Sequence, residues 1–465
     1  MKMLQVLKYA SLSQKIGIQS QLNSCLLFST TKKLLKSQQS TTNQFLQNFI
    51  KRKQNLNNKS IQFYSSSQQF SQQDFQNLIS QGKSYQEKGM TKEANLCYQQ
   101  ILQMDPQEQS LLYDLGNIFN TNGEVENAKQ CYEKILKINP QSYLAHNDLG
   151  KICQNRKCIE DAKLHYESAL KINPEYCMAI VNLGTLYQGQ GKIEDAQQLY
   201  EKALQLDNKF YQAHFNLALL YDDQGMIEQA KQYYEQTLQT NSEYYPALHN
   251  LGLIYQNEGH YQEARRCYLI ALDINPQFYQ AYISLGYFYF SLGMLEEAQQ
   301  YCEKALQIND KLLDAHLNLA LIYDSKDMIE EARQSYEKVL QINPNLYQAQ
   351  NNLGLIYRKK QMLEEAKACY QKSIQINEQY SQAYYNLSSI HYDQGNIQEA
   401  KQCLEQAIKI NPLYDQAHYN LGLIYYNQGQ LEEAKRCFMK VVLINPQDFQ
   451  VHDVLREINN YLKKE

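Results

Sequence analysis

The sequence has little of several things that would point to a membrane protein or an irregular fold. Among 465 residues there is no tryptophan, and there are only 8 prolines and 18 glycines. No apolar run approaches the roughly eighteen residues that a membrane-spanning helix needs, so we predict no membrane insertion. Tyrosine, by contrast, is abundant, with 39 residues.

Acidic residues are missing from the beginning of the chain. Residues 1–73 hold ten lysines and arginines but no aspartate or glutamate, which leaves 35 of the 45 bases against all 49 acids in the rest. We separate residues 1–74 as a basic segment, rich in Gln, Ser and Asn, that we expect to be largely disordered. Its composition is also that of a mitochondrial presequence. Mitochondrial localisation is therefore one expectation, and a low-complexity tail on a cytoplasmic protein is the other.

From Phe75 onward the sequence repeats every 34 residues. The run Asn-Leu-Gly-Leu-Ile-Tyr begins at Asn250, Asn352 and Asn420, and these starts are separated by three and two periods. Eleven repeats fill residues 75–448 without an insertion or deletion. Residues 449–465 begin another unit, which we interpret as a C-terminal capping helix.

Residue type follows position within the repeat, numbered 1 to 34. Position 20 is Ala in all eleven repeats, sixteen of the 18 glycines fall at position 8 or 15, and Tyr dominates positions 11 and 24. The apolar spacing predicts two amphipathic helices per repeat, which small residues at 8 and 20 allow to approach closely. Gly at 15 is expected to end the first helix in the left-handed conformation, and Pro at 32 to stop the second. Neighbouring hairpins must then stack to complete a core.

This pattern resembles the tetratricopeptide repeat, whose signature includes Leu-Gly at positions 7–8, Tyr at 11, Gly at 15, Ala at 20, an aromatic residue at 24 and Pro at 32. The match covers about four-fifths of the chain. The resemblance implies an all-α fold, a right-handed α-α superhelical solenoid, here preceded by the disordered basic segment. It also implies a function in binding other proteins.

In this family, positions 2, 5, 6, 9, 12 and 13 face a concave groove. Position 6 is Asn in seven repeats of this chain, position 2 is often Gln, and position 9 is often Leu. An amide offers both a donor and an acceptor, so the row could hold the backbone of an extended peptide; alternatively, Asn merely suits a solvated helix face. The candidate groove residues are Asn182, Asn216, Asn250, Asn318, Asn352, Asn386, Asn420, Gln212, Gln280, Gln348, Gln382 and Gln416.

Fixed charges are few in this predicted groove. They include Asp222, Asp223, Asp314, Asp324 and the basic pair Arg358-Lys359. The cations with which chaperone-binding members of the family clamp a C-terminal carboxylate are missing, so a chaperone-tail adaptor is not expected. The acidic balance of the repeats argues against a nucleic-acid backbone as partner. The expected partner is a protein or an extended peptide.

Patterns for catalysis and metal binding are also missing. Six of the 11 cysteines occupy position 23 without any Cys-x-x-Cys pair, and five of the nine histidines occupy position 4, where the family places a bulky packing residue. No carboxylate pair, nucleophile elbow or phosphate loop accompanies them. We predict no enzymatic activity, no cofactor and no metal site, and interpret these residues as packing groups.

The asparagine row looks most like the repeat domain of O-linked N-acetylglucosamine transferase, whose groove grips extended substrates. This chain ends seventeen residues after its last repeat, so we do not expect that enzyme's catalytic domain. Three functions follow: a scaffold that binds an extended peptide, a structural subunit of a larger assembly such as a mitochondrial one, or a transferase-like protein without its catalytic domain. The partner and the oligomeric state are left open.

Overall fold

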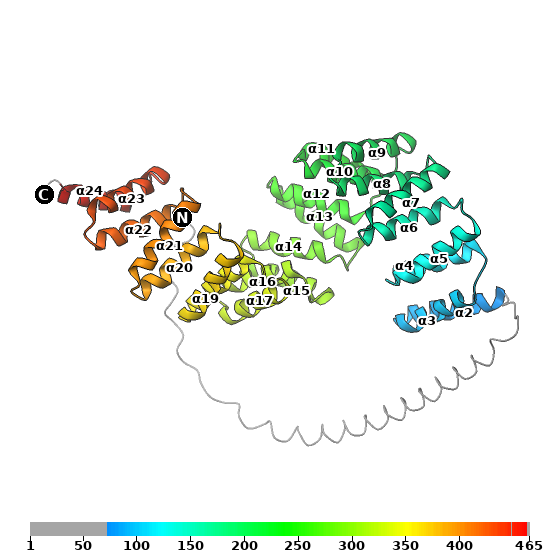
Figure 1. Cartoon of the computed structure of the whole chain (residues 1–465), viewed down its shortest axis with the longest axis horizontal. Coiled ribbons are helices and arrows are strands. Elements are labelled where there is room, and N and C mark those ends of the chain that lie inside the picture. The colour runs from blue at the N-terminus through cyan, green and yellow to red at the C-terminus, as the bar shows by residue number, and fades with distance from the viewer. Residues whose placement is uncertain (1–71, 448, 463–465) are drawn as a thin grey trace, which may run out of the picture. The chain divides into compact units, whose positions relative to one another are not determined.

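The computed structural model describes residues 72–447 and 449–462, and this part of the chain is entirely α-helical outside its turns (Figure 1). It separates into two compact bodies. The first contains the described residues up to Leu111 together with Thr121–Gly123, and the second contains Leu112–Asn120 and the chain from Glu124 onward. The predicted presequence lies outside the described residues. None of the described helices has the length and apolar character needed to cross a membrane.

The helices follow the 34-residue period. They are α2 (Gln72–Glu87), α3 (Thr91–Gln103), α4 (Gln109–Thr121), α5 (Val125–Ile138), α6 (Tyr143–Asn155), α7 (Ile159–Ile172), α8 (Cys177–Gly189), α9 (Ile193–Leu206), α10 (Tyr211–Asp223), α11 (Ile227–Thr240), α12 (Tyr245–Asn257), α13 (Tyr261–Ile274), α14 (Tyr279–Ser291), α15 (Leu295–Ile308), α16 (Leu313–Ser325), α17 (Ile329–Ile342), α18 (Tyr347–Lys359), α19 (Leu363–Ile376), α20 (Ser381–Asp393), α21 (Ile397–Ile410), α22 (Asp415–Asn427), α23 (Leu431–Ile444) and α24 (Phe449–Leu462).

The prediction of two helices per repeat is confirmed. In repeats two to eleven the first helix covers positions 1–13 and the second covers positions 17–30; we call them the A helix and the B helix. From α6 on, the two helices of a repeat pack together, and each B helix packs on the next A helix. Successive A helices also touch directly, α6 with α8, α8 with α10, α12 with α14, and α14 with α16. They form one continuous surface, the A-helix face.

Close approach of the A and B helices depends on positions 8, 20 and 24. Every Ala at position 20 is completely buried, and the tyrosines at position 24 are buried beside it. A Cβ added to Gly184 at position 8 would lie 2.6 Å from Cε1 of Tyr200 at position 24, closer than atoms can pack. The prediction that small residues allow this approach is confirmed.

Position 15 has a left-handed backbone in all eleven repeats, as predicted for glycine. Eight repeats have Gly there, with φ between 71° and 81°. The other three place a residue with a side chain in the same conformation, namely Lys157 (φ 61°), Asp327 (φ 58°) and Gln361 (φ 60°). The turn therefore imposes its conformation on whichever residue occupies it, at a cost in strain.

We expect Lys157→Gly and Gln361→Gly each to raise the free energy of unfolding by about 0.5–1 kcal/mol. The left-handed conformation costs a residue with a Cβ about 1–2 kcal/mol, which exceeds the extra chain entropy of about 0.5–1 kcal/mol that glycine loses on folding. Urea denaturation followed by circular dichroism measures the change. The reverse substitution, Gly191→Ala, is the control and should destabilise; lower stability of both glycine variants would contradict the account.

Position 31, rather than the proline at 32, marks the end of the B helix. Four B helices are followed by a residue other than proline at position 32, yet they end at position 30 like the others. These are α9, followed by Asn208, α11 by Ser242, α15 by Asp310 and α19 by Glu378. The expectation that Pro stops the helix is therefore wrong as a general rule. In nine repeats an Asn or Asp at position 31 accepts a hydrogen bond from the backbone N–H of position 33, as in Asn173 and Glu175. This side-chain turn redirects the chain.

The histidines at position 4 brace the same turn. Nε2 of His214, His316, His418 and His452 lies 2.9–3.1 Å from the backbone carbonyl oxygen of position 32 in the preceding repeat. A carbonyl can only accept, so this nitrogen carries the hydrogen. The predicted packing role of these imidazoles therefore includes a specific hydrogen bond.

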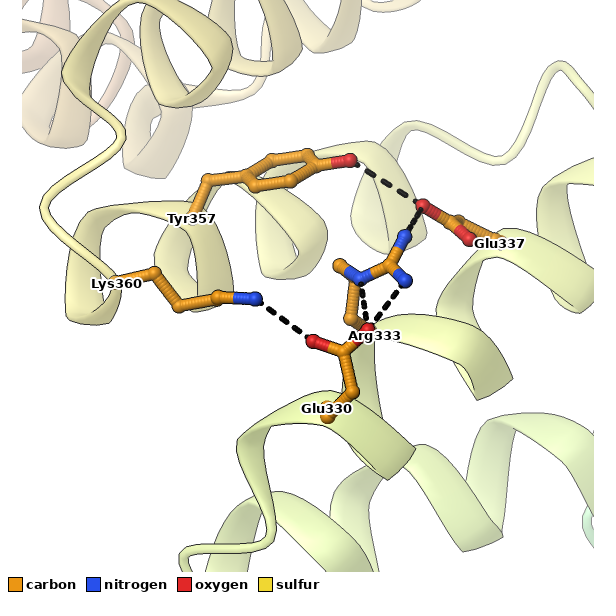
Figure 2. Close-up of polar contacts among 5 residues, drawn as sticks. All are labelled: Glu330, Arg333, Glu337, Tyr357 and Lys360. Carbon is orange, nitrogen blue, oxygen red and sulfur yellow. Dashed lines mark hydrogen bonds and ion pairs between the residues drawn. The ribbon is translucent and has the colours of Figure 1, made fainter. Parts of the chain in front are cut away.

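On the B-helix side, an ion-pair network joins repeats eight and nine (Figure 2). Arg333 of α17 bonds both Glu330 and Glu337 of the same helix. Lys360, which follows α18, reaches Glu330 at 2.7 Å, and the Tyr357 hydroxyl lies 3.3 Å from Glu337. Hydrogen bonds from Arg333 and Lys360 lower the pKa of Glu330 to about 2. Because exposed ion pairs add little stability, we interpret the network as fixing side-chain orientation.

Candidate functional site: the A-helix face

The hydroxyl of the tyrosine at position 24 lies beneath the A-helix face and forms a side-chain hydrogen bond there in several repeats. In repeats one, three, four and six this hydroxyl bonds the Gln at position 12 of the same repeat, at 2.7–3.2 Å. Burial raises the pKa of these phenols, that of Tyr200 to about 12. A buried hydroxyl needs such a partner, because leaving it unpaired costs free energy.

Repeats five and eight give the same hydroxyl a different partner. They have Ala at position 8 and Asp at position 12 in place of Gly and Gln. Here Asn250 at position 6 of the following repeat donates a hydrogen bond to the hydroxyl of Tyr234 (3.1 Å), and Asn352 lies beside Tyr336 at the equivalent place. A position-24 hydroxyl thus finds its partner at position 12 or at position 6 of the next repeat, and also at position 9, as in Tyr132–Asn117 (2.8 Å).

Side-chain bridges connect consecutive A helices across the A-helix face. Among the described residues, five of these bridges join position 5 of one repeat to position 6 of the next. They are Tyr113–Asp148 (2.8 Å), Asn147–Asn182 (2.8 Å), His249–Ser284 (2.9 Å), Asn351–Asn386 (2.8 Å) and Tyr385–Asn420 (3.3 Å). In each of them the residue at position 5 is polar.

The residue at position 5 therefore decides what the following asparagine does. Where position 5 is apolar, the next asparagine has no bridge to make. Asn250 then donates a hydrogen bond to the preceding position-24 tyrosine, while Asn352 lies beside Tyr336 and Asn318 beside Cys302, both at position 24. Asn216 follows Val181 and has no side-chain partner in the described part of the chain. The seven asparagines are therefore not equivalent.

One predicted groove residue has to be corrected. Asn386 is only 3% exposed; its amide donates to Asn351 and accepts from Gln382. Its side chain is therefore closed to a partner in this structure, unlike those of the other six asparagines. Asn182, Asn216, Asn250, Asn318, Asn352 and Asn420 remain partly exposed.

The predicted glutamines at position 2 also differ from one another. Gln280, Gln348 and Gln416 are exposed. Gln382 is held between Asn386 and the Tyr414 hydroxyl, which donates to it at 2.7 Å. Gln212 has a buried Oε1 with no hydrogen-bond partner among the described residues. Only Gln280, Gln348 and Gln416 are therefore open to a partner without rearrangement.

A second set of contacts joins position 12 of one repeat to position 13 of the next and pairs both cations of the basic pair with acids. Arg358 lies 3.4 Å from Asp393, and Lys359 bonds Asp324 of the preceding repeat. Asp223 accepts a hydrogen bond from Gln188 at 3.3 Å. Both residues of the basic pair Arg358-Lys359 are therefore paired with an aspartate.

A pocket of about 220 Å³ opens on the A-helix face of repeats nine to eleven. Its mouth is formed by Ser389, Tyr392, Asn420 and Leu423, which are partly or fully exposed. Its floor contains Leu404 of the B helix α21, which is 1% exposed. No pattern used in the sequence analysis pointed to this pocket, although Leu in place of Tyr at position 24 was visible there.

The described cysteines are free thiols, and those at position 23 are buried or half-buried. Burial raises the pKa of Cys131 to about 12 and that of Cys267, Cys369, Cys403 and Cys437 to about 11, which disfavours the nucleophilic thiolate. Within the described residues no three His, Cys, Asp or Glu side chains come together in a group that could hold a metal ion.

We expect Asp148→Asn to stabilise the protein at neutral pH. Burial raises the pKa of Asp148, although Tyr113 donates a hydrogen bond to it. An unfolded aspartate ionises near pH 4, so ionisation in the folded state costs stability above that pH and not below it. The thermal midpoint should rise by about 1–4 °C at pH 7, with no difference at pH 3.

Calorimetry at the two pH values measures this change. The control is Asp114→Asn, at the same position of the preceding repeat, where the side chain is exposed and the substitution should leave the pH dependence as it is. An Asp148→Asn variant that is less stable at pH 7 would contradict the assignment of a buried, unfavourable carboxylate.

Comparisons with known proteins support this repeat architecture. Family models described as tetratricopeptide repeat match residues 109–142, 165–198, 187–251 and 245–278. The chain is a tetratricopeptide repeat protein. The first and last of these matches have the bounds of repeats two and six. A further model, the C-terminal domain of cilia and flagella-associated protein 70, matches residues 278–464, less than half of the chain. No significant match was found among curated proteins.

Solved structures similar to this tetratricopeptide repeat protein have low sequence identity to it. YrrB, described as having an unusual peptide-binding site, is 22% identical, with 41% of this chain and 97% of that chain covered and a TM-score of 0.34. PilF of Pseudomonas aeruginosa is 20% identical, with 47% and 97% covered and a TM-score of 0.42. The APC/C hetero-tetramer Cut9-Hcn1 is 14% identical, with 83% and 96% covered and a TM-score of 0.41. The resemblance to the transferase repeats is not confirmed.

Proposed function

We propose that this tetratricopeptide repeat protein is a non-catalytic scaffold that binds an extended segment of a partner protein along its A-helix face. The observation that carries the proposal is the set of amides left open on that face. Asn216 has no side-chain partner among the described residues, and Gln280, Gln348 and Gln416 are exposed. Amides of this kind can bond a peptide backbone whatever its side chains are.

The apolar and charged residues of the face support the same function. Leu253 at position 9 is 38% exposed, and the leucines at position 9 of other repeats are partly exposed. The two cations Arg358 and Lys359 are already paired with Asp393 and Asp324, and Asp223 accepts a hydrogen bond from Gln188. Open amides beside apolar contacts suit an extended, weakly charged peptide better than a strongly charged ligand.

Selection from a random peptide library with the full chain, followed by titration of the best peptide, tests this function. The double substitution Asn216→Ala and Asn318→Ala should weaken binding about 5- to 100-fold, since each lost hydrogen bond costs about 0.5–1.5 kcal/mol. Fluorescence anisotropy of the labelled peptide measures the dissociation constant.

The matched control is Gln236→Ala, an exposed amide on the B helix α11, which should leave binding unchanged. Equal affinity of the double variant and the unmodified protein would contradict binding along the A-helix face. So would a loss of affinity in the Gln236 variant.

A second candidate is a structural subunit of a ciliary or flagellar assembly. It is favoured by the match of residues 278–464 to the C-terminal domain of cilia and flagella-associated protein 70. This candidate replaces the mitochondrial assembly as the more specific alternative. Fluorescence microscopy of the tagged full chain distinguishes the two: enrichment in cilia supports it, and an exclusively mitochondrial signal contradicts it.

A further inference from the structure

Repeat ten differs from the other repeats at the contact between its A and B helices. It has Ser388 at position 8 and Leu404 at position 24, where repeats three, four, six and nine have Gly and Tyr. In those repeats the tyrosine ring lies directly on the glycine, as Tyr370 does on Gly354. Leucine has neither the ring nor the hydroxyl of that tyrosine. The pocket of about 220 Å³ lies where Leu404 replaces it.

Other repeats without this tyrosine fill the space with their own side chains. Phe438 takes position 24 of repeat eleven and is completely buried. In repeat seven, Cys302 is completely buried in a cluster that also contains Phe288 and Tyr289. Leu404 is also buried, but it forms the floor of an open pocket rather than filling it.

The pocket keeps the positions that bond a position-24 hydroxyl elsewhere. These are position 12 of the same repeat and position 6 of the next, which in repeat ten are Tyr392 and Asn420, and both line the pocket. Asn420 donates one amide hydrogen to Tyr385 at 3.3 Å. Its carbonyl oxygen and second hydrogen remain for a ligand.

We propose that this pocket binds a tyrosine side chain of the extended partner segment, whose phenol takes the place of the tyrosine that repeat ten lacks. The inference rests on the proposed function, because the segment must lie along the A-helix face for its side chain to reach the mouth. Leu404, Leu423 and Ile424 provide apolar walls for the ring, and Asn420 and Ser389 provide polar partners for the hydroxyl.

The charges around the pocket favour a neutral phenol over an anionic ligand. Arg358 is the only cation that lines it, and Asp393, which also lines it, pairs with that arginine at 3.4 Å. A phosphorylated tyrosine would place its charge next to the Asp393 carboxylate. Tyr392 at the mouth is 45% exposed, whereas Leu404 and Ser388 at the floor are buried.

The direct test uses p-cresol, which is the tyrosine side chain as a free molecule, and methyl-labelled full-length protein in NMR. p-Cresol should shift the methyl signals of Leu423 and Ile424 and bind with a dissociation constant on the order of millimolar, as expected for a ligand of this size. Toluene, which lacks the hydroxyl, should bind about 3- to 10-fold more weakly. p-Cresyl phosphate should bind more weakly than p-cresol.

Two variants show whether the response comes from this pocket. Ser388→Gly with Leu404→Tyr restores the pair found in repeats three, four, six and nine, fills the pocket, and should abolish the response to p-cresol. Leu164→Tyr adds the same side chain at an exposed site, 62% exposed, and should leave the response intact. If the double variant does not fold, Asn420→Ala provides the test: it should weaken p-cresol and leave toluene unchanged.

Several results would overturn the proposal. They are unchanged methyl signals with p-cresol, an equal response in the pocket-filling variant, toluene binding as tightly as p-cresol, and tighter binding of the phosphate. None of these depends on the peptide titration above. A negative result for phenol binding in the pocket can therefore be told apart from a negative result for peptide binding along the A-helix face.

Discussion

The contact between position 24 of the B helix and position 8 of the A helix is the constraint on which the rest of the structure depends. It places a tyrosine ring against a glycine, as between Tyr200 and Gly184, and buries both beside the Ala at position 20. The ring's hydroxyl then lies beneath the A-helix face and needs a partner there. Most repeats with this tyrosine provide the partner from position 12 or from position 6 of the next repeat, and repeat two provides it from Asn117 at position 9.

In repeat nine, the side chains at position 12 and at the next position 6 both have other partners. The residue at position 12 is Arg358, which pairs with Asp393, and the next position 6 is Asn386, which is bonded to Asn351. The hydroxyl of Tyr370 is buried and has no hydrogen-bond partner among the described residues. The A-helix face is therefore a network in which one substitution changes the partners of its neighbours. Which amides are open to a partner depends on that network.

Features that depend on position within one repeat could be predicted from the sequence. The two helices, the left-handed turn at position 15 and the small residues at 8 and 20 follow from local spacing and backbone sterics. The hydrogen-bond partners of the asparagines at position 6 could not be predicted in this way. Asn182 and Asn216 have the same position and the same residue type, and differ only because Asn147 precedes one and Val181 the other, 35 residues earlier.

Two signals were present in the sequence but not used. Asn or Asp recurs at position 31, where it forms the turn that Pro at 32 was expected to form. Leu404 interrupts the row of aromatic residues at position 24, where the pocket lies.

The central claim is that the residue at position 5 decides whether the asparagine at position 6 of the next repeat forms a bridge to it. A crystal structure of the Val181→Asn variant tests it most directly. Val181 is 3% exposed, and the asparagines at the same position in two other repeats are equally buried. The account predicts that Nδ2 of Asn216 moves to within about 3 Å of the introduced amide oxygen, as in Asn147–Asn182 at 2.8 Å. An Asn216 side chain that stays where it is would contradict the account.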